Sequence, residues 1–263
     1  MRDFSNKVIV ITGATSGIGL KLTNKLASMK ARLILVGRSE QKLLKLQEDL
    51  RKQFQVNSDY YRIDLLDRTK WQTTLAQIIN HYDRIDAVIN NAGFGVFDYA
   101  VATDPIVTEQ MFQLNVLALI EATRQFIPVF QAQNFGHLIN IASFAGKLAT
   151  PKSAVYSATK HAVLGYTNAV RLEIEQKNIY VTAVNLGPVR TAFFQQADPN
   201  GDYQKAISSY MLDPDYVADQ IIRYLFRRKR EINLPKWMAV GAKLHHQFPQ
   251  FIERVMRGAF NKK

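Results

Sequence analysis

A glycine-rich turn, Thr12-Gly13-Ala14-Thr15-Ser16-Gly17-Ile18-Gly19, follows the apolar run Val8–Ile11 and precedes an amphipathic segment. It therefore lies where a strand is expected to pass into a helix. Gly13 lets the chain turn sharply, Gly17 leaves bare backbone for a phosphate, and Gly19 lets the helix pack closely on the sheet. The N–H groups and positive dipole end of that helix favour a pyrophosphate. The turn predicts a dinucleotide site that also includes Thr15, Ser16 and Ile18, whereas a purely structural turn would need no ligand.

Short apolar or β-branched runs alternate with amphipathic segments along the rest of the chain. The predicted strands are Lys7–Thr12, Arg32–Gly37, Asp59–Asp64, Ile85–Asn90, Gly136–Ala142, Ile179–Leu186 and Glu231–Leu234. The predicted helices are Gly17–Met29, Glu40–Phe54, Arg68–His81, Glu109–Phe130, Ala154–Lys177 and Pro214–Arg228. Runs such as Leu33–Val36 are apolar without alternation, which is typical of strands buried on both faces of a parallel sheet. We therefore expect an α/β protein with a doubly wound parallel sheet, the Rossmann fold, as a single domain over residues 1–234.

The composition excludes several kinds of chemistry. The chain has 263 residues and no cysteine, which rules out disulfides, cysteine-ligated metals and thiol catalysis. His245 and His246 are adjacent and would point about 100° apart on a helix, so no metal site is expected. The most apolar long window, Leu114–Phe130, carries polar and charged residues and is not expected to span a membrane. With no secretory signal recognised, we expect a cytoplasmic location.

The positive charge is concentrated at the end of the chain. Of the formal net charge of +12, most lies in Ile221–Lys263, which holds eleven Lys or Arg and two Glu. Apolar residues also recur there at helical spacing: Phe248, Phe251, Ile252, Val255, Met256 and Phe260. We therefore predict a basic amphipathic helical extension over residues 235–263. It would form a lid, pack against another subunit, or make peripheral contact with an anionic membrane; nucleic-acid binding is not expected, because no recognition motif accompanies the charge.

The end of the second predicted strand bears on the choice of cofactor. It reads Val36-Gly37-Arg38-Ser39, where dinucleotide folds face the adenosine ribose. An acidic residue would bind the 2′-hydroxyl, but here Arg38 offers a guanidinium fork for a 2′-phosphate. The sequence thus favours NADP, with NAD as the alternative cofactor if Arg38 is only a solvated loop residue.

Further motifs follow at the ends of the later strands. In chain order they are Ile63-Asp64-Leu65, Asn90-Asn91-Ala92-Gly93, Leu114-Asn115-Val116, Asn140-Ile141-Ala142-Ser143 and Tyr156-Ser157-Ala158-Thr159-Lys160. In this order and at these spacings, the sequence resembles the short-chain dehydrogenase/reductase family from about Lys7 to Leu234. The resemblance implies hydride transfer between nicotinamide and a carbonyl or alcohol. It also implies a catalytic tetrad of Asn115, Ser143, Tyr156 and Lys160.

The residue types suit that chemistry. Tyr156 and Lys160 are four apart and share a helix face, and an ammonium beside the phenol is expected to lower its pKa. Ser143 would hydrogen-bond the substrate oxygen while Tyr156 donates a proton to it. The resemblance further implies that Lys160 holds the nicotinamide ribose and that Asn115 supports a water in a proton relay. The cofactor contacts that it implies are Asp64 and Leu65 near the adenine, Asn91, Ala92 and Gly93 after the fourth strand, and Val189 and Thr191 near the carboxamide.

Two positions depart from the family pattern. After the sixth strand the family usually has P-G-x-x-x-T, but this chain reads Leu186-Gly187-Pro188-Val189-Arg190-Thr191, so the path of the loop is open. Ser16 stands where many NADP-using relatives carry Lys or Arg, so the NADP prediction depends on Arg38.

The substrate side is apolar. Phe94, Phe193 and Phe194 follow the fourth-strand turn and the sixth strand, and they favour a lipophilic ketone, aldehyde or 3-oxoacyl substrate. The alternative is that these aromatic residues only pack the loop down. A homodimer or homotetramer is implied by the resemblance, through the long helix that carries Tyr156. The rival function is a catalytically silent dinucleotide-binding sensor, or a scaffold that docks through its basic tail.

Overall fold

A parallel seven-stranded sheet forms the centre of the computed structural model, which describes residues 3–174 and 178–260, with side chains described through residue 255. The strand order is β3-β2-β1-β4-β5-β6-β7, with every neighbouring pair parallel. The strands are β1 (Val8–Thr12), β2 (Arg32–Gly37), β3 (Ser58–Arg62), β4 (Ala87–Asn90), β5 (Gly136–Ile141), β6 (Ile179–Leu186) and β7 (Glu231–Leu234). The order reverses direction between β1 and β4, so the doubly wound parallel sheet of the Rossmann fold is confirmed.

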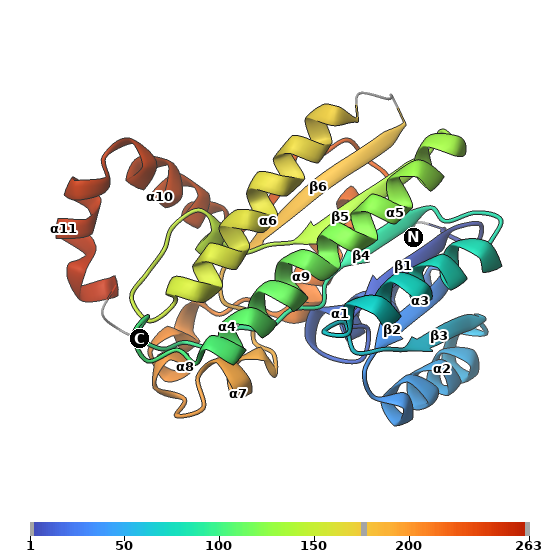
Figure 1. Ribbon diagram of the computed structural model, residues 1–263, viewed down its shortest axis with the longest axis horizontal. Coiled ribbons are helices and arrows are strands. Elements are labelled where there is room, and N and C mark those ends of the chain that lie inside the picture. Colours follow the sequence, from blue (N-terminus) through green and yellow to red (C-terminus); the bar gives the residue numbers. More distant parts are fainter. Residues whose placement is uncertain (1–2, 175–177, 261–263) are drawn as a thin grey trace.

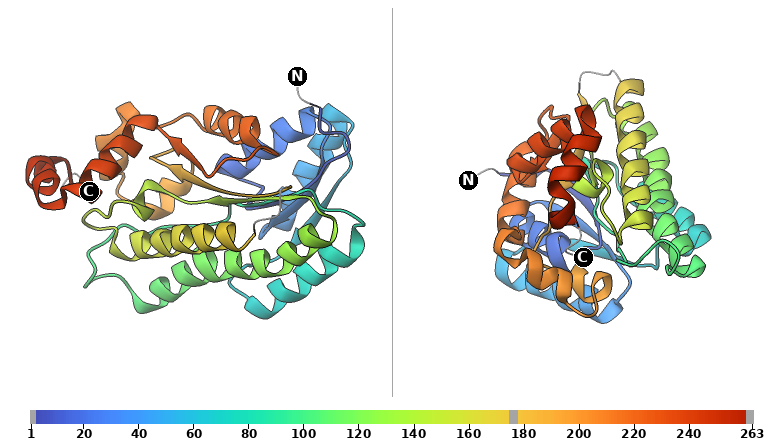
Figure 2. Two further views of the ribbon diagram at one scale, coloured as in Figure 1. Left: turned by 90° about the horizontal axis from the view of Figure 1, so that it is seen from above. Right: turned by 90° about the vertical axis from the view of Figure 1, so that its left-hand side faces the viewer.

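Helices cover both faces of the sheet (Figures 1 and 2). One face carries α1 (Gly17–Ser28), α2 (Glu40–Phe54) and α9 (Pro214–Tyr224), and the other carries α3 (Arg68–His81), α5 (Ala118–Ala132) and α6 (Ala154–Glu173). The remaining helices are α4 (Pro105–Phe112), α7 (Phe193–Ala197), α8 (Asp202–Ile207), α10 (Lys236–Gln247) and α11 (Pro249–Phe260). Three short turns complete the list: η1 (Gln113–Leu117), η2 (Phe144–Gly146) and η3 (Ser208–Tyr210).

The uninterrupted apolar strands supply two cores at once. In β1, Ile9 and Ile11 belong to the core beneath α1 and α9, whereas Val10 belongs to the core beneath α3 and α5. In β2, Leu33 and Leu35 likewise belong to the core beneath α1 and α9, and Ile34 belongs to the core beneath α3 and α5. Successive side chains of a strand point to opposite faces, so a strand covered on both sides needs apolar residues at every position.

Some predicted boundaries are wrong, and the local chemistry explains them. The third strand ends at Arg62 rather than Asp64, because the Asp64 carboxylate accepts a hydrogen bond from the Leu66 amide at 3.1 Å and turns the chain. The long helix predicted for Glu109–Phe130 begins earlier, at Pro105, where Asp104 caps the amide of Ile106 at 2.7 Å.

That predicted helix is also divided. A π-helical turn, η1, separates α4 from α5. A turn of this kind widens the helix by one residue and re-aims the side chains that it carries. On the later helix, α6 ends at Glu173, and the predicted end at Lys177 lies outside the described residues.

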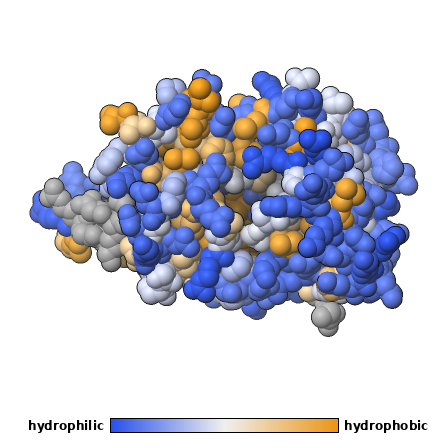
Figure 3. Space-filling model, turned by 90° about the horizontal axis from the view of Figure 1, so that it is seen from below, coloured by the Kyte–Doolittle hydropathy of each residue, from blue (hydrophilic) through white to orange (hydrophobic). Residues whose placement is uncertain are grey.

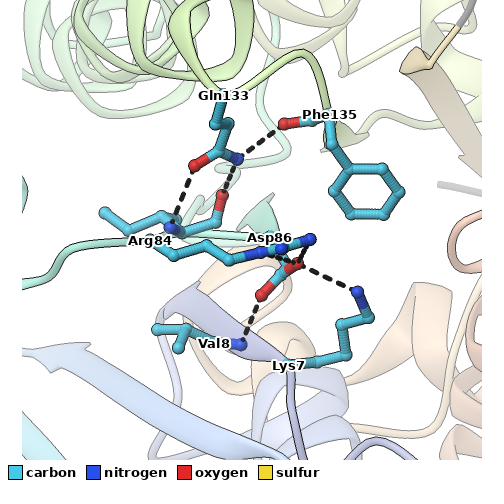
Figure 4. A network of polar contacts seen from close by, with 7 residues as sticks. Lys7, Val8, Arg84, Asp86, Gln133 and Phe135 are labelled. Atoms are coloured by element: carbon cyan, nitrogen blue, oxygen red, sulfur yellow. Dashed lines mark hydrogen bonds and ion pairs between the residues drawn. The ribbon is translucent and has the colours of Figure 1, made fainter.

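A buried carboxylate ties together the edge of the sheet where the strands begin (Figure 4). Asp86 is fully buried, and its oxygens accept from Lys7 Nζ at 3.1 Å, Arg84 Nε at 2.7 Å and the Val8 amide at 3.0 Å. Beside it, the Gln133 amide nitrogen donates to the carbonyl of Phe135 at 2.6 Å. Because the buried charge is paired with two cations, the network offsets its own desolvation and fixes β1 against β4.

His137 lies in the same edge and is fully buried in β5. Its Nδ1 accepts from the Phe226 amide at 2.9 Å, so the neutral ring carries its proton on Nε2, which lies 2.9 Å from Thr182 Oγ1. Burial lowers the pKa of His137 to about 3. The histidine is thus a core residue with both ring nitrogens satisfied.

We expect His137 to make stability fall in mild acid. Its folded pKa is below the unfolded value, so the unfolded chain takes up the proton first as the pH falls from about 6.5 toward 3. The free energy of unfolding should therefore decrease by up to about 1.4 kcal/mol per pH unit from this group. Denaturant unfolding at pH 7.5, 6 and 5 should show a shallower decrease for His137→Gln, whereas removal of the exposed imidazole in His246→Gln should not alter it. Equal slopes for all three proteins would contradict the expectation.

Candidate functional site

A cavity of about 590 Å³ opens where the strands end, which is where open parallel sheets bind ligands. A hollow near the middle of the molecule, with apolar residues around part of it, is visible in Figure 3. The lining comes from every major loop at this edge. The predicted site residues that line it are Gly13, Thr15, Ser16, Gly17, Ile18, Arg38, Leu65, Asn91, Ala92, Gly93, Phe94, Ser143, Tyr156, Lys160, Val189, Thr191, Phe193 and Phe194. Gly19, Asp64 and Asn115 lie outside this lining.

The turn after β1 is bonded to the turn after β4. Thr12 Oγ1 accepts from the amides of Asn91 and Ala92, each at 3.0 Å, and the Asn91 side chain donates to the Thr12 carbonyl at 2.9 Å. Gly13 and Gly17 have φ of +66° and +51°, a left-handed conformation that favours glycine. Gly19 is required by a close approach, since a Cβ there would lie 2.1 Å from the Gly13 carbonyl oxygen.

The lining at the end of β2 is basic. Arg38, Ser39 and Lys42 all line the cavity, and Ser39 caps α2 by accepting from the Lys42 amide at 3.4 Å. The sequence prediction missed Lys42, although it stands four residues after Arg38, one helical turn along, where a second cation faces the same space. Asp64 is exposed and turned into its own loop, so its contact with the adenine stays a prediction, whereas Leu65 lines the cavity.

Both the oxygen and the nitrogen of the Asn115 side-chain amide are hydrogen-bonded inside the protein. The residue lies in the π-helical turn η1 and is buried. Its Oδ1 accepts from the Phe94 amide at 3.0 Å, and its Nδ2 donates to the Phe94 carbonyl at 2.8 Å and to Thr159 Oγ1 at 3.2 Å. Asn115 therefore fixes the loop after β4 against α6. Its predicted support of a relay water stays a prediction.

Ser143, Tyr156 and Lys160 come together at one end of the cavity. Ser143 lies two residues beyond β5, caps η2 and hydrogen-bonds Tyr156. Its hydroxyl also lies within bonding distance of the Leu186 carbonyl, at 3.3 Å. Lys160 is buried, donates to the Ile141 carbonyl at 2.9 Å, and stands 5.8 Å from the centre of the Tyr156 ring. The predicted grouping of these three residues on one face of the cavity is therefore observed.

The pKa of Tyr156 is raised, whereas the sequence predicted that a neighbouring ammonium would lower it. Burial raises the pKa of Tyr156 to about 12, although the hydrogen bond with Ser143 lowers it in part. Burial also lowers the pKa of Lys160 to about 8. Desolvation of the phenolate therefore outweighs the hydrogen bond from Ser143. At neutral pH the Tyr156 hydroxyl thus keeps its proton, which suits a group that donates one.

Aromatic rings pack around the ring of Tyr156. The Phe97 ring contacts Tyr156 at 5.9 Å, Phe193 at 6.2 Å and Tyr203 at 5.4 Å between centroids. Phe94 and Phe193 are partly buried and face the cavity. Phe194 also lines it but is 4% exposed, because it packs beneath with Ile207 and Met211. The aromatic residues therefore both line the cavity and hold its cover in place.

The loop with the altered motif keeps its contacts. The Gly187 amide donates to the Leu234 carbonyl at 2.7 Å, and the Arg190 amide donates to the Leu212 carbonyl at 2.9 Å. A Cβ on Gly17 would lie 3.3 Å from Thr191, so Thr191 closes against the glycine-rich turn. The substitution of Leu186 and Pro188 into the pattern leaves Val189 and Thr191 at the cavity.

Comparison with known proteins agrees with this geometry. The sequence profile described as short chain dehydrogenase matches residues 7–201. The chain belongs to the short-chain dehydrogenase/reductase family. An NADP-dependent 3-hydroxy acid dehydrogenase of Schizosaccharomyces pombe is 30% identical, over 88% of this chain and 92% of that protein. The family resemblance of the motifs is thereby confirmed, and the protein is an oxidoreductase of this family.

Solved structures share the fold. A short-chain dehydrogenase from Sphingobium yanoikuyae in complex with NADPH superposes with a TM-score of 0.80 and 26% identity, covering 92% of this chain and 95% of that one. A short-chain dehydrogenase/reductase from Burkholderia phymatum in complex with NAD gives a TM-score of 0.83 at 24% identity, covering 95% and 96%. Both dinucleotides thus occur among the structural neighbours.

The residues of this chain fit a nicotinamide dinucleotide. The two glycines with positive φ expose backbone beside the start of α1, which is the arrangement that receives a pyrophosphate. Gly93 passes close to the tetrad, because a Cβ there would lie 3.0 Å from Asn115 Oδ1 and 3.7 Å from Lys160 Nζ. The lining of the one cavity includes both Arg38, after β2, and Tyr156, on α6, so the cavity spans several strands of the sheet.

The packing of Gly19 predicts the outcome of a small substitution. In Gly19→Ala the new methyl group would meet backbone at the Gly13 carbonyl, and such overpacking costs about 1–3 kcal/mol. We expect a lower melting temperature and weakened dinucleotide binding, measured by thermal unfolding and fluorescence titration.

Gly241→Ala provides the matched control. Nothing lies within 4 Å of a Cβ at Gly241, which is in the helix α10, so the added methyl group should leave dinucleotide affinity unchanged and should not lower the melting temperature, since alanine favours a helix over glycine by about 1 kcal/mol. Wild-type stability and affinity in Gly19→Ala would show that the close approach of α1 to the turn is not needed.

Proposed function

We propose that this protein is an NADP-dependent reductase of lipophilic carbonyl compounds, with Tyr156 as the proton donor. The main support is the setting of Tyr156: its hydroxyl is protonated at neutral pH and hydrogen-bonded by Ser143, and its ring packs against Phe97 and Phe193 at the cavity. A desolvated donor of this kind matches the reduction of a carbonyl, in which the oxygen must receive a proton.

Each member of the tetrad has a part in that step. The bound nicotinamide cofactor supplies the hydride. Ser143 holds the substrate oxygen, and Tyr156 Oη gives that oxygen its proton. Lys160, held by the Ile141 carbonyl, keeps a positive charge beside the cofactor ribose and the phenol. Asn115 fixes the Phe94 backbone and thereby the wall that faces the substrate.

We expect Tyr156→Phe to remove turnover and leave dinucleotide binding nearly intact. The change deletes the proton donor and almost no volume, and loss of acid catalysis costs about 10²–10⁴-fold in rate. Steady-state kinetics with NADPH and a panel of lipophilic ketones, aldehydes and 3-oxoacyl thioesters measures it. Tyr166→Phe, on the same helix but outside the cavity lining, is the control and should retain wild-type turnover. Activity of Tyr156→Phe within a few-fold of wild type would contradict the assignment.

The basic end of the cavity supports NADP as the preferred cofactor. Arg38 and Lys42 line the same end, and together they offer a guanidinium fork and an ammonium to a 2′-phosphate. Arg38→Ala and Lys42→Ala should each weaken NADPH binding and leave NADH binding little changed. Lys45→Ala, an exposed lysine on the same helix but away from the cavity, is the control. Fluorescence titration measures the affinity of each variant for NADPH and for NADH. Equal affinities of the wild type for the two cofactors would overturn the preference.

The lining supports a lipophilic substrate. Phe94, Phe97, Phe193 and Leu148 face the cavity together with Met238 from α10, so most of the space near Tyr156 is apolar. The similarity to a 3-hydroxy acid dehydrogenase places 3-oxoacyl compounds among the first to test in the panel. If the wild type reduces none of these compounds but binds dinucleotide, the catalytically silent sensor becomes the better description.

The outer face of α6 supports a homo-oligomer. Ala158, Gly165, Ala169 and Leu172 are exposed along it, and Leu172 is 68% exposed. Small residues at this spacing allow another helix to approach closely. We therefore propose a homodimer or homotetramer that packs through α6.

A further inference from the structure

The last two helices project from the body at the end of the molecule that holds the cavity (Figures 1 and 2). We call α10 and α11 together the C-terminal arm. Its first helix contacts the body through Met238, which lines the cavity, and through Ala242, which is 7% exposed. A Cβ on Gly187 would lie 2.7 Å from the Met238 sulfur, so this side of α10 forms part of the cavity wall.

The opposite side of the arm is an exposed apolar stripe. Its members are Trp237, Val240, Leu244, Phe248, Phe251 and Val255, each between 45% and 66% exposed. Successive members are three or four residues apart, so within each helix they lie on one face. On α10 this face is turned about 100° or more from Met238 and Ala242. Trp237 also meets the Tyr210 ring of the body, at 6.4 Å between centroids, and the exposed remainder of the stripe is left for a partner outside the folded body.

Cations flank the stripe. Lys236, Lys243 and Arg254 are exposed on the arm, at helical positions next to the apolar face. The acidic residue of the arm, Glu253, lies 3.1 Å from His245 Nε2 and joins the two helices. The sequence adds Arg257, Lys262 and Lys263 to the same end of the chain. An apolar stripe bordered by lysine and arginine is the pattern of helices that lie at a lipid surface.

The structure divides the basic tail that the sequence presents as one segment. Arg227–Arg230 follow Phe226, which packs against Phe4 and His137 where the strands begin. The arm starts after β7, where the strands end. The four-residue strand β7 therefore separates this basic run from the arm by about 13 Å. A surface that meets the arm does not need the basic run.

Charge favours an anionic surface over a second copy of the chain. A symmetric contact would place the same patch of both subunits face to face, and the cations of one arm would then oppose those of the other. Anionic headgroups neutralise the same charges, and Trp and Phe side chains settle at the level of the headgroups. Among the described residues, no helix is long and apolar enough to cross a membrane, so contact through the arm would be at the surface.

We propose that the C-terminal arm docks on an anionic membrane surface through its apolar stripe and flanking cations, and so holds the cavity wall formed by Met238 at the lipid interface. This surface is independent of the reaction assigned above. It gives a lipophilic substrate a short path from the bilayer to the cavity.

Vesicle co-sedimentation of the full chain tests the proposal without any activity measurement. The vesicles are phosphatidylcholine alone and phosphatidylcholine mixed with phosphatidylglycerol. The wild type should pellet with the anionic vesicles at low salt and be released at high salt, because surface charges are screened. Phe248→Ser/Phe251→Ser should lose binding. Lys236→Ser/Lys243→Ser should bind roughly 30-fold more weakly.

Arg227→Ser/Arg228→Ser is the matched control, since it removes two exposed positive charges from the opposite edge and should bind within about 2-fold of wild type. Dinucleotide titration verifies that each variant is folded, and if the phenylalanine variant is not, the exposed lysine pair carries the test. A wild type that stays in the supernatant overturns the proposal, as does equal loss in the two charge variants. Light scattering that shows a smaller assembly for Phe248→Ser/Phe251→Ser would identify the stripe as a subunit interface and overturn it too.

Discussion

The close approach of α1 to the turn after β1 is the constraint on which the site depends. The Gly13 carbonyl lies where a side chain on Gly19 would be, and Asn91 reaches into the same space from the turn after β4. Two loops from neighbouring strands are thereby locked in one arrangement, at the point where the order of the strands reverses. The loop after β6 closes on this pair through Thr191, which a Cβ on Gly17 would meet at 3.3 Å.

Polar residues inside the sheet extend that lock across the molecule. Asn90 donates to Asn140 at 2.9 Å, and Asn140 donates to Thr167 at 2.9 Å. All three are buried, so each depends on its partner to offset the cost of leaving water. The chain of bonds joins β4, β5 and α6. It therefore sets the position of α6, and with it Tyr156 and Lys160, relative to the turn that would receive the cofactor.

Local patterns in the sequence predicted the fold and most of the cavity lining. Strands buried on both faces appear in the sequence as uninterrupted apolar runs. The geometry of the glycine-rich turn and of the Tyr156–Lys160 pair depends only on residues close in sequence, so it could be predicted as well. What escaped prediction depends on packing between distant segments. The pKa of Tyr156 is raised by burial among rings such as Phe97 and Phe193. Lys42 lines the cavity because of the way α2 leaves β2. Arg227–Arg230 are separated from the arm because β7 runs between them. The π-helical turn at Asn115 was equally hidden, because its cause is the fit of α4 and α5 to the body.

Gly95 links Tyr156 to the aromatic wall of the cavity. A Cβ at this position would lie 2.8 Å from the Tyr156 ring and 2.9 Å from the Phe193 ring, so the two rings press against the same bare backbone. A side chain introduced in this loop would therefore displace Tyr156 as well as Phe193. Met238 borders the cavity from α10, an element that carries neither of these rings. The last helices of the chain are thus where a proposed substrate specificity has most freedom to change.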